Sequence, residues 1–219
     1  MYKLKYITGL LLFMLVTNGS AFAAAPSGEM MQAVEKLQHE WEVIKFNTDK
    51  NRQEAAFEAL AKKAHSVSET YPNQAEPMAW EAIILSTYAG AKGGFGALKL
   101  VESARDLLLQ AEKINPVALD GSIYASLGNL YHQVPGWPIG FGSDKKARGY
   151  FEKALSINPD GIEPNYFYGQ LLYDEGEYEK ALQTLNRALN APPRAGREIT
   201  DAGQREEIAV IIKDVKRQL

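Results

Sequence analysis

The chain contains no cysteine among its 219 residues. This absence excludes disulfide bonds, thiol catalysis, cysteine-ligated zinc and a lipid anchor attached through cysteine. The chain also has no excess of basic residues, because it contains 24 Lys and Arg and 27 Asp and Glu. The resulting net charge of -3 provides no positive electrostatic field. We therefore expect no nucleic acid among the partners of this protein.

Long hydrophobic runs are scarce as well. The main one covers residues 7–16, which is too short to cross a membrane as a helix. Two lysines precede this run and Ala21-Phe22-Ala23 follows it, which is the order of a secretory signal peptide. We expect residues 1–23 to be a cleavable signal peptide, cut after Ala23, with no membrane span after cleavage. The lack of cysteine and of a glycosylation acceptor beyond that point favours a periplasmic location.

Most of the remaining chain has apolar residues at intervals of three and four. Two clear stripes are Met30, Val34, Leu37, Trp41 and Ile44, and Phe57, Leu60, Ala64, Val67 and Tyr71. Such stripes are typical of amphipathic helices that bury one face. Sustained alternation with β-branched residues is absent, so we predict no strands and an all-α fold.

Similar phrases ending in proline recur along the chain. They close at Pro116, Pro159 and Pro193. The best copy runs from residue 162 to residue 193, with Gly169 and Ala181 at the positions where paired helices cross closely. It resembles the tetratricopeptide repeat, whose period is 34 residues. The resemblance implies a right-handed superhelix of helix pairs that acts as a non-enzymatic protein-interaction scaffold.

The repeats divide the chain into consecutive helix pairs. We predict a degenerate N-terminal pair at 28–72, two tetratricopeptide-like pairs at 76–116 and 120–159, the best-matching repeat at 162–193, and a C-terminal capping helix with a polar outer face at 200–219. The second and third pairs each carry an insertion between their helices. One insertion is the glycine-rich segment 89–98, and the other is the Pro/Gly/Trp segment 134–143.

The first helix of each pair is expected to line the concave face of the superhelix. Counting from Gly128 and Gly169, the side chains predicted there are Asn129, His132, Tyr166, Gln170 and Tyr173. Amides and tyrosines suit the binding of a peptide backbone or of a mixed polar and apolar ligand. The tyrosines equally suit simple packing between neighbouring pairs.

Aromatic side chains stand out in the two insertions. Phe95 lies in the first, and Trp137 and Phe141 lie in the second. Both insertions join the helices of adjacent pairs, so both should emerge at the same edge. One hypothesis is an apolar lip over the groove that holds a ligand or partner. The alternative is that both loops fold back and cover core.

Catalytic motifs are lacking. The three histidines are scattered without metal-ligand spacing, and the glycine-rich segments form neither a phosphate loop nor a nucleophile elbow. We therefore predict no enzyme activity, no cofactor and no metal. The principal hypothesis is a periplasmic scaffold with a protein or peptide partner in the envelope. The layout also resembles the periplasmic T component associated with TRAP-type transporters, which implies an accessory that binds a small apolar or acidic ligand, with the insertions forming the pocket mouth.

Overall fold

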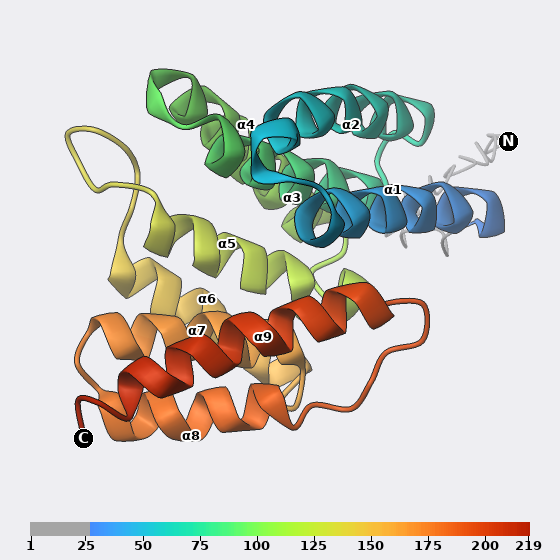
Figure 1. The fold of residues 1–219 in the computed structure, drawn as a ribbon. Coiled ribbons are helices and arrows are strands. Elements are labelled where there is room, and N and C mark those ends of the chain that lie inside the picture. The colour runs from blue at the N-terminus through green and yellow to red at the C-terminus, as the bar shows by residue number, and fades with distance from the viewer. Residues whose placement is uncertain (1–26) are drawn as a thin grey trace, which may run out of the picture.

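The computed structural model describes residues 27–219, so the expected signal peptide lies outside the described residues. The described part contains α-helices and one short 3₁₀ turn, with no strand (Figure 1). In chain order the elements are α1 (Gly28–Asn47), α2 (Lys50–Thr70), α3 (Ala75–Lys92), α4 (Gly94–Ile114), η1 (Ala118–Gly121), α5 (Ser122–Gln133), α6 (Asp144–Ile157), α7 (Ile162–Asp174), α8 (Tyr178–Leu189) and α9 (Glu198–Val215). The predicted all-α array of helix pairs is confirmed.

Local sequence signals set the helix ends. The Ser27 hydroxyl accepts a hydrogen bond from the Met30 backbone N–H at 3.2 Å and so caps the start of α1. Helix α2 ends at Thr70, two residues before Pro72, which disfavours helix at the residue preceding it. Gly176, with φ of 78°, makes the left-handed turn between α7 and α8.

Paired helices approach most closely where the sequence places glycine. A Cβ atom added to Gly128 on α5 would lie 2.5 Å from Cε1 of Phe151 on α6. A Cβ atom added to Gly169 on α7 would lie 2.6 Å from Cγ of Leu185 on α8. Phe151 and Leu185 are both fully buried, so neither side chain has free space into which it could move.

We expect Gly128→Ala to lower the free energy of unfolding by about 1–3 kcal/mol, because the methyl group overpacks the contact with Phe151. The matched control is Gly149→Ala on α6, where an added Cβ meets nothing within 4 Å. There alanine should raise stability by roughly 0.5–1 kcal/mol through helix propensity. Urea denaturation of both variants measures the difference. Equal effects at the two positions would contradict the close crossing.

The glycine-rich segment 89–98 differs from the loop that we expected. Helix α3 continues to Lys92 and α4 begins at Gly94, so most of the segment is helical. The chain reverses at Gly93 and Gly94, whose φ angles are 64° and 62°, a region that favours glycine. The extra residues of this pair therefore lengthen two helices rather than forming a loop.

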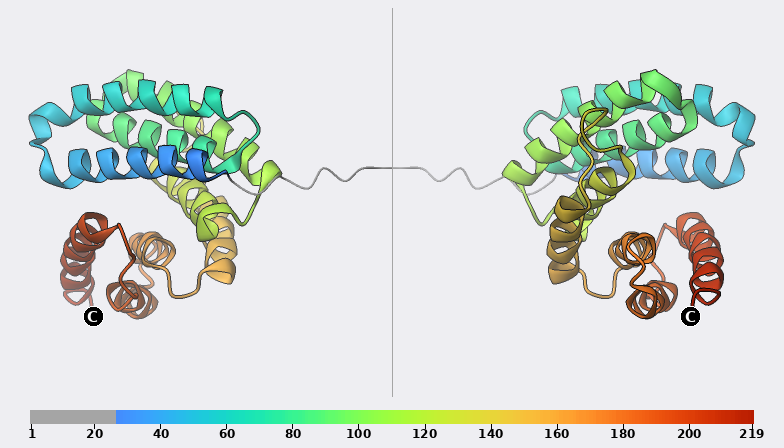
Figure 2. Two further views of the ribbon diagram at one scale, coloured as in Figure 1. Left: turned by 90° about the vertical axis from the view of Figure 1, so that its right-hand side faces the viewer. Right: turned by 90° about the vertical axis from the view of Figure 1, so that its left-hand side faces the viewer.

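The second insertion, residues 134–143, is a loop that lies along α4 (Figures 1 and 2). Its Phe141 ring packs edge-on against Tyr131, with the ring centroids 5.4 Å apart. The Arg105 guanidinium on α4 lies 4.5 Å from the centroid of the same ring. The loop and the start of α4 consequently form one edge of the molecule.

Five helices, α1, α3, α5, α7 and α9, form an inner ring in which each contacts the next and α9 contacts α1. Helices α2, α4, α6 and α8 pack on the outside as the partners of α1, α3, α5 and α7. Figures 1 and 2 show α9 lying beside α1, so that the last helix returns to the first. The array is therefore closed on itself rather than open at its C-terminal end.

A buried carboxylate holds the ring closed. Glu42 on α1 is 2% exposed and accepts hydrogen bonds from the backbone N–H of Thr200 at 3.2 Å and from its hydroxyl at 2.8 Å. Thr200 lies in the first turn of α9, where a negative charge stabilises the helix. The two helices approach so closely here that a Cβ atom added to Gly203 on α9 would collide with the Phe46 ring on α1.

Candidate functional site

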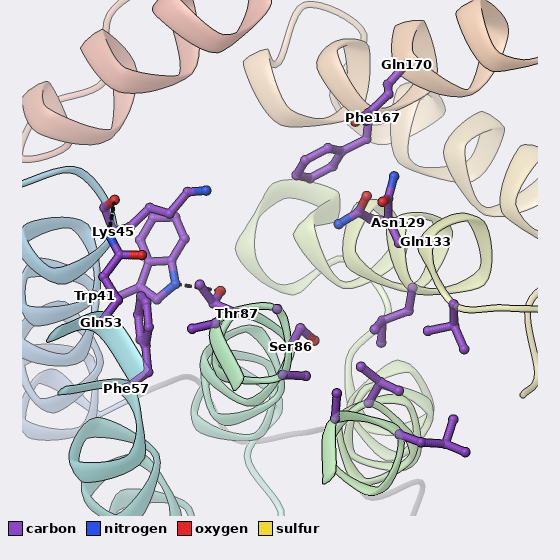
Figure 3. Close-up of a pocket in the computed structure, with 18 of the residues that line it drawn as sticks. Trp41, Lys45, Gln53, Phe57, Ser86, Thr87, Asn129, Gln133, Phe167 and Gln170 are labelled. Atoms are coloured by element: carbon purple, nitrogen blue, oxygen red, sulfur yellow. Dashed lines mark hydrogen bonds between the residues drawn. The ribbon is translucent and has the colours of Figure 1, made fainter. Parts of the chain in front are cut away.

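A cavity of about 1000 Å³ lies at the inner ring and opens to solvent, and we call it the central cavity. Helices α1, α2, α3, α4, α5, α7 and α9 and the 134–143 loop all contribute to its lining. Figure 3 shows Trp41, Gln53 and Phe57 on one side of the space, and Asn129, Gln133, Phe167 and Gln170 on the other, with Ser86 and Thr87 between. The size lies at the upper end of the range for ligand sites, and the lining is mostly apolar with a few polar groups.

Some polar groups of the lining are already hydrogen-bonded within the protein. The Gln53 amide donates to the carbonyls of Ile44, Lys45 and Thr48 at 3.0–3.1 Å and so caps the end of α1. The Trp41 indole N–H donates to the Thr87 hydroxyl at 2.9 Å (Figure 3). These hydrogen bonds join the helices that form the wall of the cavity. They leave these groups with few free donors or acceptors for a ligand.

Three amides remain available in the central cavity. Asn129, Gln133 and Gln170 make no side-chain hydrogen bond to any other residue in 27–219. Asn129 and Gln133 are four residues apart and share a face of α5, and Gln170 lies opposite them on α7 (Figure 3). An amide both donates and accepts, so this group matches the alternating N–H and C=O groups of a peptide.

Charged residues border the cavity where α1 meets α9. Glu207 lies 3.1 Å from the Lys45 ammonium and accepts a hydrogen bond from the Tyr166 hydroxyl at 3.3 Å. Burial, together with the nearby Glu207 charge, raises the pKa of Tyr166 well above its usual range. Tyr166 is therefore a neutral hydrogen-bond donor at physiological pH, and its hydroxyl helps to hold α7 against α9.

Exposed apolar side chains lie at the cavity and in the adjoining loop. Phe95, at the start of α4, is 102% exposed relative to the reference residue, while Trp137 and Ile139 in the loop are 90% and 67% exposed. Phe95 and Ile139 both border the central cavity. We call these three side chains the rim. Large apolar groups that are exposed to water beside a cavity are typical of a surface that contacts another molecule.

The structure places some of the residues predicted for the groove in the central cavity and others outside it. Asn129, Tyr166 and Gln170 line the central cavity. His132 and Tyr173 do not belong to its lining. His132 has its Nδ1 2.8 Å from an Asp144 oxygen and its Nε2 2.9 Å from an Asp174 oxygen, so it links α5, α6 and α7. Tyr173 packs against Tyr178 on α8, with ring centroids 5.9 Å apart.

The residues predicted for the lip also lie in different surroundings. Phe95 borders the cavity, whereas Trp137 is exposed on the loop and does not belong to the lining of the cavity. Phe141 instead turns inward onto Tyr131 and Arg105 and covers core. Phe141 therefore covers core, and the hypothesis of a lip stays a prediction for Phe95 and Trp137.

Several lining residues had not been predicted. Trp41, Ser86, Thr87 and Gln133 come from the inner helices, and Gln204 and Glu207 come from α9. Gln133 follows Asn129 by one helical turn, and that spacing could have identified it. Helix α9 gave no such signal, because its polar residues look like a solvated outer face.

No group of three or more His, Asp or Glu side chains in 27–219 is placed to hold a metal ion. None of the helices in this part of the chain is long and apolar enough to cross a membrane.

Comparison with known proteins shows which protein family part of the chain resembles. Residues 145–199 match the family model of the tetratricopeptide repeat. The human tetratricopeptide repeat protein 6 is 33% identical over 96 residues, which cover 42% of this chain and 17% of the human protein. The chain therefore matches only a small part of that relative's length.

Three solved structures show a partial likeness to this chain. MamA has a TM-score of 0.41 and 16% identity, and the match covers 78% of this chain and 92% of MamA. A thermophilic TPR protein of Thermus thermophilus has a TM-score of 0.42 and 13% identity, with 83% of this chain and 99% of that chain covered. Pseudomonas aeruginosa pilF has a TM-score of 0.34 and 18% identity, with 85% of this chain and 93% of that chain covered. Likenesses of this size do not bear on function. None of these matches supports a transporter accessory. Residues 145–199 thus carry a tetratricopeptide repeat, set within an all-α array of helix pairs.

Proposed function

We propose that this protein is a non-enzymatic scaffold of the bacterial periplasm that binds a partner protein at the mouth of its central cavity. A tetratricopeptide fold suggests protein–protein interaction, and the signal-peptide pattern of residues 1–23 supports export. The observation that carries the proposal is the exposed rim. Burying Phe95, Trp137 and Ile139 under a partner would remove apolar surface from water at a cavity that can receive part of that partner.

The available amides favour a polypeptide as the occupant of the cavity. Asn129, Gln133 and Gln170 offer donors and acceptors on two facing helices, as a peptide backbone requires. A small apolar molecule would leave these amides unsatisfied, which costs about 1–3 kcal/mol for each buried group. The rim and the amides together therefore favour a polypeptide over a small apolar ligand.

We expect the double substitution of Phe95 and Trp137 by alanine to reduce partner binding at least tenfold. Both side chains are almost fully exposed, so their truncation should leave the thermal midpoint unchanged. Aromatic anchors of this kind commonly contribute more than 1 kcal/mol each to an interface. The measurement is the quantity of each protein that is cross-linked to the scaffold in cells of the source organism.

The matched control replaces Val117 and Val210 by alanine. These side chains are 59% and 62% exposed, and neither borders the central cavity. A protein that is retained by this control and lost with the rim variant supports the proposal. Equal loss from both variants, or no cross-linked protein with the wild type, would refute it.

A further inference from the structure

One joint of the inner ring differs from the other four. Apolar side chains fill the joints α1–α3, α3–α5, α5–α7 and α7–α9. Trp41 packs on Trp80 across the first of these with ring centroids 6.0 Å apart, and Leu172 and Ile208 share a buried cluster across the last. No apolar cluster in residues 27–219 contains side chains from both α1 and α9. We call this fifth joint, between α1 and α9, the seam.

Polar contacts hold the seam closed. The buried carboxylate of Glu42 accepts two hydrogen bonds from Thr200. Lys45 pairs with Glu207 at 3.1 Å, and these side chains are 28% and 36% exposed. The Phe46 ring lies against the backbone of α9. Hydrogen bonds and partly exposed ion pairs are exchanged for contacts with water at a small net cost, whereas parting an apolar joint exposes its whole buried area. The seam is therefore the joint at which the ring opens most readily.

A backbone segment opposite the seam is suited to act as a hinge. Leu119, Asp120 and Gly121 are three successive residues with φ angles of 54°, 51° and 84°. A left-handed conformation is uncommon for a bulky residue such as leucine, and strained positions of this kind cluster in ligand clamps and switch regions. The segment joins α4 to α5, and α5 is the middle helix of the ring. Rotation there would move α1–α4 away from α5–α9 and would part the seam.

The seam borders two cavities. A smaller cavity of about 120 Å³, which we call the inner cavity, adjoins the central cavity. Trp41 on α1 and Gln204 on α9 line both cavities, so both sides of the seam contribute to the wall of each. Lys45 and Glu207, which pair across the seam, also line the central cavity. Opening of the seam would therefore join the two cavities into one groove that is open between α1 and α9.

We propose that the ring opens at the seam, admits an extended segment of the partner protein from the side, and closes over it. The proposal rests on the proposed function, because it states how the partner reaches the amides of the central cavity. A ring that stays closed receives a chain only through its mouth, whereas an open ring can receive a segment from the middle of a chain. Closure then returns the Glu42 carboxylate to Thr200 and holds the segment in place.

The opening is measured by pulsed electron paramagnetic resonance between two spin labels. The chain has no cysteine, so Lys36→Cys on α1 and Ala202→Cys on α9 place one label on each side of the seam at exposed positions. We expect the labelled protein to give chiefly one distance. Replacing Glu42 with alanine should add a longer distance and raise the ratio of the longer to the shorter at least tenfold, because the buried hydrogen bonds that close the seam are lost.

Two further pairs of labels serve as controls. Lys36→Cys with Lys113→Cys lies within α1–α4, Lys145→Cys with Ala202→Cys lies within α5–α9, and all four positions are exposed. Neither pair should change its distance when Glu42 is replaced. A longer distance across the seam alone supports the proposal. A single distance across the seam in Glu42→Ala, or longer distances in the control pairs as well, would overturn it.

A disulfide across the seam tests whether opening is needed for the partner to enter. A Cβ atom added to Gly203 lies 2.7 Å from Cγ of Phe46. One bond of about 1.5 Å joins that Cγ to the Cβ atom of Phe46, so cysteines at both positions bring their Cβ atoms to within about 4.2 Å, as a disulfide requires. In its oxidised form, Phe46→Cys/Gly203→Cys should be cross-linked in cells to the partner of the rim at least tenfold less than its matched control.

The matched control is Phe46→Ala/Gly203→Ala, which removes the same ring and adds the same Cβ atom but forms no bond across the seam. Mass spectrometry of the non-reduced protein checks that the disulfide has formed. Equal cross-linking by the two proteins would show that the partner enters through the mouth of a closed ring and would overturn the proposal. The spin-label distances need no partner, and the rim variants do not alter the seam, so the proposed function is judged separately.

Discussion

Replacing Gly90 with tryptophan should abolish partner binding and leave the fold intact. Gly90 lies on α3 and borders the central cavity, and a Cβ added there meets nothing within 4 Å. An indole at this position would therefore extend into the cavity and occupy the space that a partner segment needs. We expect binding to fall by a factor of 100 or more, on the order of 3 kcal/mol, because the indole takes up space that the bound segment needs. Quantitative cross-linking in cells measures the loss.

Gly149→Trp provides the matched control. Gly149 is also a helical glycine with open space around its Cβ position, but it lies on α6, outside the cavity. Both substitutions add the same side chain to a helix, and both should leave the thermal midpoint within a few degrees of the wild type. Normal binding by Gly90→Trp, or equal losses with the two variants, would show that the cavity is not used.

Replacing Glu42 with alanine should open the ring between α1 and α9. The carboxylate is buried and accepts two hydrogen bonds from Thr200, so its removal leaves a backbone N–H and a hydroxyl unsatisfied in the interior. We expect the free energy of unfolding to fall by about 2–4 kcal/mol. Amide hydrogen exchange in the first turns of α9 should become faster. Chemical denaturation and exchange mass spectrometry measure these two effects.

Glu35→Ala is the control for this closure. Glu35 lies on α1 but is exposed and forms no ion pair or side-chain hydrogen bond with the described residues. Its replacement should change stability by no more than about 0.5 kcal/mol. A loss of stability with Glu42→Ala that spared the exchange rates of α9 would place the effect within α1 and contradict closure.

The helical array itself could be predicted from the sequence. Apolar stripes at intervals of three and four give α1 and α2, and Gly169 and Ala181 mark the crossing of α7 with α8. These signals are local, because each depends on residues within one helix or one pair. The structure of segment 89–98 was harder to predict. Glycines that end a helix and glycines within a loop look alike in sequence.

Part of the candidate site also followed from helix geometry. Asn129 and Gln170 each follow a packing glycine by one residue, which turns them about 100° away from the partner helix and toward the cavity. His132 and Tyr173 each follow it by four residues. That spacing returns them to within about 40° of the glycine, so they meet the neighbouring helices instead.

Contacts between the two ends of the chain could not be predicted. Glu42 and Thr200 are far apart in sequence, and neither residue lies in a recognisable motif. Glu207 looked like part of a solvated face, yet it binds Lys45 and Tyr166. Such pairs depend on how tightly the array curves. That curvature is the sum of small rotations at every pair and cannot be read from any one of them.

The most direct test of the central claim is site-specific photo-cross-linking in cells. A photoreactive amino acid is placed at Gly90 in the cavity, at Trp137 on the rim and at Gly149 on the outer surface. We predict that the first two positions cross-link to the same protein. Position 149 should give no such product. Two results would contradict a partner-binding cavity. One is a cross-link to that protein from position 149 as strong as that from position 90, and the other is no cross-link from position 90.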